Sequence, residues 1–185
     1  MDQWSLLNRS HLVLRAESVD DAGVRLSVAL ANRPEVRTIS LLLDPSIQEI
    51  TPWLRTVRAA TPEKRGMLVQ RFFARLFVKA GYDVIVGREF DIFARGKLRS
   101  LFVEVKSSLR GGNFGSRTEL IQLDAYLTVA ERRRAERWLG VTGINKPMRL
   151  ASAFRAGMLA RNIGLLEIRW ISSNETLLPH LLGIS

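Results

Sequence analysis

An α/β protein with a strand-rich N-terminal region is the fold that this sequence indicates. Residues 11–43 contain three segments in which apolar and polar residues partly alternate, as they do in half-buried strands. From residue 61 onward, helices with an apolar face alternate with short apolar strands. We therefore expect two regions: an N-terminal β-meander plus a short helix in residues 1–60, and the main α/β domain in residues 61–185.

The N-terminal region is expected to be a three-stranded meander. Its strands are predicted at residues 11–17, 23–30 and 36–43, because the turn-forming stretches 20–23 and 32–34 separate them. A break follows, and a serine there can cap a short helix. An accessory or dimerisation role is the expectation for this region.

The second region begins with a helix whose start is well marked. Thr61 suits the N-cap and Pro62 the first turn, and the helix should run to Ala80 before Gly81 ends it. Apolar spacing predicts the remaining elements: a strand at 82–86, a long helix at 118–138, a loop at 140–147, a helix at 148–162 and a buried strand at 164–171.

Two acids and a lysine stand out between these elements. Asp91 precedes an Arg-Gly-Lys turn between two apolar strands, and Glu104 and Lys106 follow it. Side chains at i and i+2 of a strand share a face, so Glu104 and Lys106 project together and a hairpin brings Asp91 beside them. Paired carboxylates suit a hard divalent cation, and a neighbouring lysine can orient water or stabilise a phosphoryl oxygen. A simple Glu104–Lys106 ion pair is the alternative interpretation.

The positive charge of the chain lies in its second region. Residues 1–60 hold 7 basic and 7 acidic residues, whereas residues 61–185 hold 21 and 11, so the whole formal charge of +10 lies there. A basic surface confined to one region indicates a polyanion, most simply nucleic acid. A generally arginine-rich composition is the alternative. Two arginine-containing segments are expected to bind a phosphate backbone. They are the glycine-rich loop with Arg110 and Arg117, and the segment with Arg132, Arg133, Arg134 and Arg137.

Several classes of protein are excluded or disfavoured by what the sequence lacks. There is no cysteine, which rules out disulfides, thiolate metal sites and cysteine nucleophiles. No phosphate-binding glycine motif of the nucleotide-binding folds occurs, so no nucleotide cofactor is expected. The start of the chain lacks the features of a signal peptide, and no apolar stretch is long enough to span a bilayer. A cytoplasmic protein that does not bind membranes is the expectation.

The order of these elements and the acid–acid–lysine set resemble the PD-(D/E)xK nuclease superfamily, which has the restriction-endonuclease-like fold and includes archaeal Holliday-junction resolvases and RecB-like nucleases. The likeness covers about residues 62–171. Asp91 corresponds to the aspartate of the motif, and Glu104 and Lys106 to its Glu-x-Lys. Gln122 and Tyr126 are similar to the Gln-x-x-x-Tyr helix that follows the site in RecB-like members.

The resemblance implies a core of a mixed central sheet flanked by helices, and a set of roles. Asp91, Glu104 and the backbone carbonyl of Val105 would hold Mg²⁺ or Mn²⁺, Lys106 would act on the attacking water, and Gln122 and Tyr126 would orient the site or contact DNA. One departure is Gln70, where many members place an acid on the first helix. Either the second metal position is weak, or Glu89, near Asp91 on the same strand, supplements the site.

The expected function is that of a metal-dependent DNA nuclease, directed by DNA structure and active in repair or recombination. A homodimer is expected from the superfamily, because cutting two strands usually takes two sites. Two alternatives stay open: a DNA-binding subunit of the same fold with weak or no activity, which Gln70 motivates, and an RNA nuclease.

Overall fold

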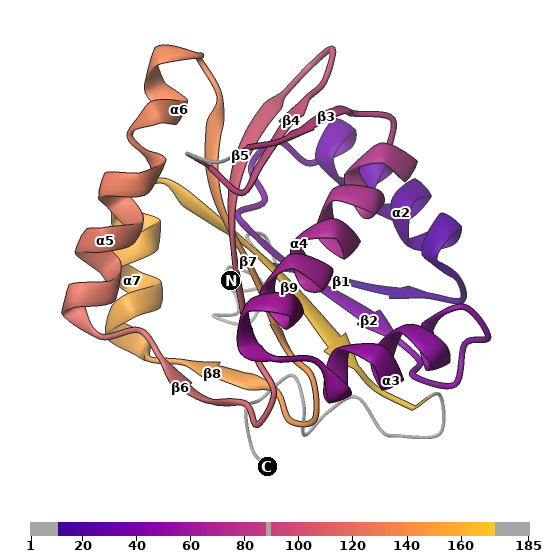
Figure 1. The fold of residues 1–185 in the computed structure, drawn as a ribbon. Coiled ribbons are helices and arrows are strands. Elements are labelled where there is room, and N and C mark those ends of the chain that lie inside the picture. Colours follow the sequence, from indigo (N-terminus) through magenta and orange to yellow (C-terminus); the bar gives the residue numbers. More distant parts are fainter. Residues whose placement is uncertain (1–10, 88–89, 173–185) are drawn as a thin grey trace, which may run out of the picture.

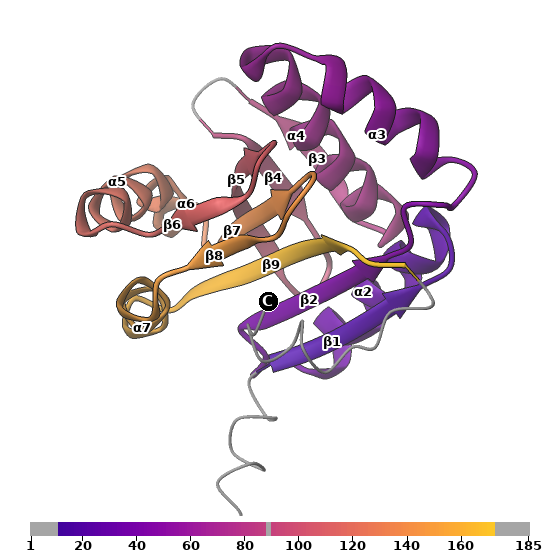
Figure 2. The ribbon, with the colours of Figure 1, turned by 90° about the horizontal axis from the view of Figure 1, so that it is seen from below.

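The computed structural model describes residues 11–87 and 90–172, which form a central sheet between two layers of helices (Figures 1 and 2). The sheet has seven strands in the order β1-β2-β9-β7-β5-β4-β3. The first five in this order are parallel to one another, whereas β4 pairs antiparallel with β5 and β3 pairs antiparallel with β4. The strands are β1 (His11–Ala16), β2 (Thr38–Leu43), β3 (Asp83–Val86), β4 (Ile92–Arg95), β5 (Ser100–Ser108), β7 (Glu136–Gly143) and β9 (Ile163–Trp170).

Helices cover both faces of the sheet. One face carries α2 (Val19–Asn32), α3 (Ile50–Ala59) and α4 (Pro62–Lys79), and the other carries α5 (Arg117–Leu127), α6 (Val129–Arg132) and α7 (Ser152–Ala160) (Figures 1 and 2). A separate parallel pair, β6 (Gly112–Phe114) and β8 (Met148–Leu150), lies beyond the ends of β5 and β7. The expected α/β architecture, with a mixed sheet flanked by helices, is therefore confirmed.

Each helical layer packs its own apolar core onto the sheet. On the α4 side, Trp53, Phe72 and Trp170 join α3, α4 and β9, with ring centroids 4.5 to 5.6 Å apart. On the α5 side, Phe93 and Phe102 stack with ring centroids 4.5 Å apart. Burial of such large apolar side chains on both faces makes β5, β7 and β9 the interior strands of the fold.

The predicted N-terminal meander is wrong. Residues 23–30 belong to helix α2, which places apolar side chains on one face at helical spacing, including Val19, Leu26 and Leu30. Ser18 caps this helix by accepting a hydrogen bond from the amide of Asp21. The acidic stretch that resembles a turn is therefore the first turn of a helix, where negative charge is favourable.

The N-terminal strands are part of the central sheet. β1 and β2 are parallel, and β2 pairs along its whole length with β9, from Thr38 beside Leu165 to Leu43 beside Trp170. The first 60 residues thus contribute two strands and two helices to the same layers as the rest of the chain. This differs from the expected β-rich appendage, because the apolar face of α2 is buried against α4 and the sheet rather than against a meander.

The predictions for residues 118–162 were only partly right. The long helix ends early, and residues 136–143 form β7 rather than a helix end and a loop. Trp138, Leu139 and Val141 are buried there because β7 lies between β5 and β9. The helix predicted from residue 148 likewise begins with strand β8 before α7.

Three local predictions are confirmed. Helix α4 begins after Thr61, whose side chain accepts a hydrogen bond from Lys64, and it ends one residue before Ala80. The buried strand near residues 164–171 is β9. The strands around the Arg-Gly-Lys turn pair as an antiparallel hairpin. Within the described ranges, no helix combines the length and apolar character of a membrane span.

Candidate active site

Asp91 lies directly before β4 and is held by neighbours on both sides. Its Oδ2 accepts a hydrogen bond from the backbone N–H of Val105 at 2.7 Å. The side-chain amide of Gln70 on α4 donates to its Oδ1 and to its backbone oxygen, both at 3.0 Å. These contacts fix the carboxylate against β5, on the side where Glu104 also lies.

Glu104 and Lys106 project from β5 and form an ion pair. The Lys106 Nζ lies 2.7 Å from the Glu104 Oε1. The glutamate side chain is only 12% exposed, whereas the lysine side chain is 40% exposed, so the pair has one buried and one accessible end. The ion pair expected under the alternative interpretation is therefore present. Asp91 lies beside it as a second acid.

The two acids influence each other. Burial raises the pKa of Glu104 above its ordinary value, and the charge of Asp91 and a side-chain hydrogen bond with it act in the same direction. Lys106 opposes this rise through its hydrogen bond and its positive charge. Two neighbouring carboxyl groups, at least one of them largely buried, are most stable when a cation or a proton lies between them.

A cavity of about 280 Å³ opens beside this acid–lysine pair. Glu104 and Lys106 line it from β5, and Gln122 and Tyr126 line it from α5. Gln122 and Tyr126 lie one helical turn apart and share a face, and Tyr126 is 58% exposed. The structure therefore brings the Glu-x-Lys residues of β5 and the Gln-x-x-x-Tyr residues of α5 together around one accessible cavity.

Glu119 also lines this cavity, and the sequence reasoning missed it. Its carboxylate accepts hydrogen bonds from the amides of Gly115 and Ser116, while its own amide donates to the Ser116 side chain. The hydrogen bond from Ser116 lowers the pKa of Glu119, and the one from Gly115 adds to this. The Ser-x-x-Glu spacing predicts such a capping box, but only the fold places it beside β5.

The donor atoms present suit a hard divalent cation. Asp91, Glu104 and the carbonyl of Val105 supply oxygen, the ligand atom that Mg²⁺ and Mn²⁺ prefer. Among residues 11–87 and 90–172, no group of three or more histidine or acid side chains gathers as a metal site. Next to Asp91, Gln70 contributes an amide rather than a carboxylate. Glu89, expected to supplement the site, lies outside the described residues.

The arginines expected to hold DNA occupy two distant places. Arg110 and Arg117 lie beside the β6–β8 pair, whereas Arg132, Arg133 and Arg134 lie at the end of α6, at the opposite end of the molecule (Figure 1). Arg133 lies over the ring of Phe93, 5.7 Å from its centroid.

The contacts of Arg137 connect elements of the fold. It lies in β7 rather than in the predicted helix, and its side chain is 18% exposed. Its guanidinium pairs with Asp124 at 2.8 Å and also donates to the backbone oxygen of Arg161. These contacts tie β7 to α5 and to the end of α7, so the side chain has little left to offer a ligand.

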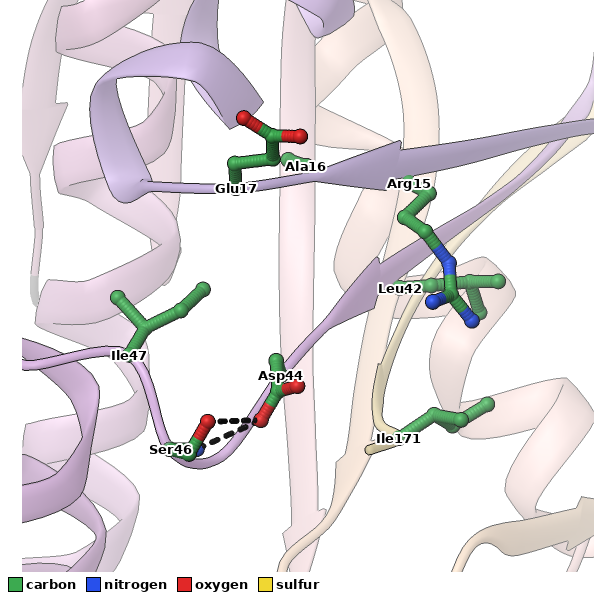
Figure 3. A pocket seen from close by; sticks show the side chains of 8 residues that line it. All are labelled: Arg15, Ala16, Glu17, Leu42, Asp44, Ser46, Ile47 and Ile171. Carbon is green, nitrogen blue, oxygen red and sulfur yellow. Dashed lines mark hydrogen bonds between the residues drawn. The ribbon is translucent and has the colours of Figure 1, made fainter. Parts of the chain in front are cut away.

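A second hollow of about 370 Å³ lies at the carboxyl ends of β1 and β2 (Figure 3). Arg15, Glu17 and Asp44 are its charged residues. Asp44 accepts hydrogen bonds from the amide and the hydroxyl of Ser46, at 2.8 and 2.6 Å, so its carboxylate holds the turn after β2. None of the predicted site residues contributes to this hollow.

No protein-family model matches the chain, and no match was found among the curated proteins with which it was compared. The case for its function therefore depends on the geometry of its own residues.

Proposed function

We propose that this chain is a metal-dependent DNA nuclease that hydrolyses phosphodiester bonds. The observation that carries the proposal is the meeting of Asp91, Glu104 and Lys106 beside an accessible cavity. A buried glutamate next to a second carboxylate costs stability, which a purely structural site would avoid.

The residues of the site have different proposed roles, according to their chemistry and position. Asp91, Glu104 and the carbonyl of Val105 would hold Mg²⁺ or Mn²⁺, which when bound supplies an activated water and neutralises phosphate charge. Gln70 keeps the Asp91 carboxylate turned toward β5 through its two hydrogen bonds. Lys106, with its accessible ammonium group, positions the attacking water or balances charge that develops on the phosphate.

The substrate follows from the charge of the surface rather than from a reading of bases. The excess of basic residues favours a polyanion, and we infer a nuclease directed by DNA structure, acting in repair or recombination, that works as a homodimer. Tyr126 and Gln122 face the cavity from α5, where they can contact the nucleotide beside the cleaved bond.

Cleavage assays test this proposal. Plasmid, branched and single-stranded DNA, with RNA of the same shape as a competitor, are incubated with the protein in Mg²⁺ or Mn²⁺. We expect cleavage that Asp91→Asn abolishes and that Lys106→Ala slows by about 10²-fold or more, the usual loss when a group that stabilises charge in the transition state is removed. Lys64→Ala, which removes an exposed lysine of α4, is the matched control and should keep full activity.

A DNA-binding subunit without activity is the second candidate. The double hydrogen bond from Gln70 favours it, because this amide occupies one oxygen of Asp91 and replaces the acid that many nucleases of this kind have. Tight DNA binding without cleavage in either metal, by wild-type protein of native fold, would select this candidate.

A further inference from the structure

A basic groove of about 550 Å³ lies beside the two-stranded β6–β8 sheet. Its side walls carry the three cations Arg110, Lys146 and Arg149, together with Asn113, and none of the lining residues among 11–87 and 90–172 is an acid. Arg110, Lys146 and Arg149 are all exposed. The volume lies within the ~300–1,000 Å³ of pockets that hold ligand-sized groups. The sequence reasoning singled out Arg110 but not Lys146 or Arg149.

Glycines bring the two walls of the groove together. A Cβ on Gly111 would lie 2.7 Å from the backbone oxygens of Lys146 and Pro147, and one on Gly143 would lie 1.9 Å from the oxygen of Lys146. Gly111 also has a φ of +70°, which favours glycine. Only glycine at these positions lets the turn after β5 lie directly against the turn after β7.

Hydrogen bonds then fasten these two turns. The amides of Ile144 and Asn145 donate to the backbone oxygens of Ser108 and Leu109, at 2.8 and 3.0 Å. Beyond them, Asn113 and Arg149 are register partners in β6 and β8, so their side chains project to the same side. Backbone hydrogen bonds thus fix the positions from which the charged groups of the groove extend, which reduces the entropy cost of binding an anion.

Strand β6 separates this groove from the candidate active site. Asn113 lines the groove, whereas its neighbour Phe114 lines the cavity that contains Glu104 and Lys106. A sugar–phosphate backbone bound in the groove would therefore be separated from the Glu104–Lys106 pair only by strand β6. The nearby N-terminus of α5 is not the anion site, because Glu119 already accepts hydrogen bonds from Gly115 and Ser116.

We propose that the β6–β8 groove binds the DNA sugar–phosphate backbone and delivers it to the Glu104–Lys106 cavity. The identity of the polyanion rests on the proposed function. The groove itself is inferred from its three exposed cations and its fixed walls. Binding is independent of base sequence, because the groove offers cations and one amide rather than a pattern for reading base edges.

Fluorescence anisotropy with labelled single-stranded and duplex DNA, in buffer with EDTA, tests this proposal. The groove variant carries Arg110→Gln, Lys146→Gln and Arg149→Gln. Its matched control carries Lys64→Gln, Arg71→Gln and Arg75→Gln on α4, which removes the same charge from the other face of the sheet. Lys146→Glu alone, at an exposed turn, serves if the triple variant does not fold.

We expect the groove variant to bind at least ~10-fold more weakly than the control, with a shallower salt dependence. Each lost phosphate contact removes about 0.9 from the slope of log K against log salt for duplex DNA, and about 0.7 for a single strand, so three contacts remove roughly 2 to 3. The form of DNA that shows the larger loss is the one that the groove holds.

Three results would overturn the proposal: unchanged affinity and slope in the groove variant, an equal loss in the α4 control, or no measurable DNA binding by the wild-type protein. Because EDTA prevents cleavage, these outcomes are separate from the test of the nuclease. A wild-type protein that binds through the groove but never cleaves contradicts the nuclease alone, and a cleaving enzyme with an unaffected groove variant contradicts the groove alone.

Discussion

Replacing Gln70 by glutamate changes the candidate active site at the residue that holds the Asp91 carboxylate. Gln70 donates to two oxygens of Asp91, a carbonyl and a carboxylate, each at 3.0 Å. A neutral hydrogen bond contributes about 0.5–1.5 kcal/mol and one to a charged group about 1.5–3 kcal/mol, so loss of both costs roughly 2–4 kcal/mol. For a protein of this size, such a loss lowers Tm by roughly 5–15 °C.

Gln70→Ala and Gln70→Glu differ in a way that isolates the metal. Both lose the two hydrogen bonds, but the glutamate also places a third negative charge beside Asp91 and Glu104, so it should be the less stable variant in EDTA. Added Mg²⁺ should reverse the order, because a third carboxylate strengthens the metal site. Each tenfold gain in Mg²⁺ affinity stabilises the folded state by about 1.4 kcal/mol once the ion is in excess.

Thermal melts of the three proteins in EDTA and across a Mg²⁺ titration measure these differences. The reasoning is refuted if Gln70→Glu melts no lower than Gln70→Ala in EDTA, or if Mg²⁺ raises the Tm of both variants equally. Either result would mean that residue 70 does not stand beside a cation position.

Further substitutions test the site and the fold. The pKa of Glu104 is raised in the folded state, so this residue lowers the stability of the wild-type protein as pH rises above 4.5, the ordinary pKa of a glutamate. Glu104→Gln should therefore have a higher Tm than wild type at about pH 8 in EDTA, and this difference in Tm should disappear toward about pH 4. Phe73→Ala, at a fully buried position, should cost about 3–5 kcal/mol in urea unfolding. Gly143→Ala, whose Cβ would lie 1.9 Å from a backbone oxygen, should cost about 1–3 kcal/mol, whereas Gly66→Ala, in a helix with nothing near the added methyl, should gain about 0.5–1 kcal/mol. An equal effect at both glycines would contradict the contact argument.

The sequence predicts the hairpin and helix α4 because local chemistry alone determines them. Thr61 and Pro62 mark a helix start in any context, and the Arg-Gly-Lys turn closes two apolar strands whichever elements surround it. The approach of Asp91 to Glu104 follows from the same hairpin. These predictions needed no knowledge of distant contacts.

The errors arose where distant contacts decide the structure. Residues 23–30 contain valine and leucine in partial alternation, which obscures the local capping signal at Ser18, and packing of α2 against α4, with Gly23 close to Lys79, favours the helix. Residues 136–143 follow an arginine-rich helical stretch, and pairing with both β5 and β9 makes them a strand. The position of Glu119 and the β6–β8 groove depend on these same pairings, so the local pattern could not reveal them.

The ladder between β2 and β9 sets a practical limit on how the chain can be shortened. Removing the first sixty residues would expose the hydrogen-bonding groups along Leu165–Trp170 and remove the Trp53 ring that packs against Trp170. A bare, apolar strand edge of this kind recruits other chains. A truncated protein of residues 61–185 should therefore precipitate or self-associate, and protein purified for biochemistry must retain strand β2.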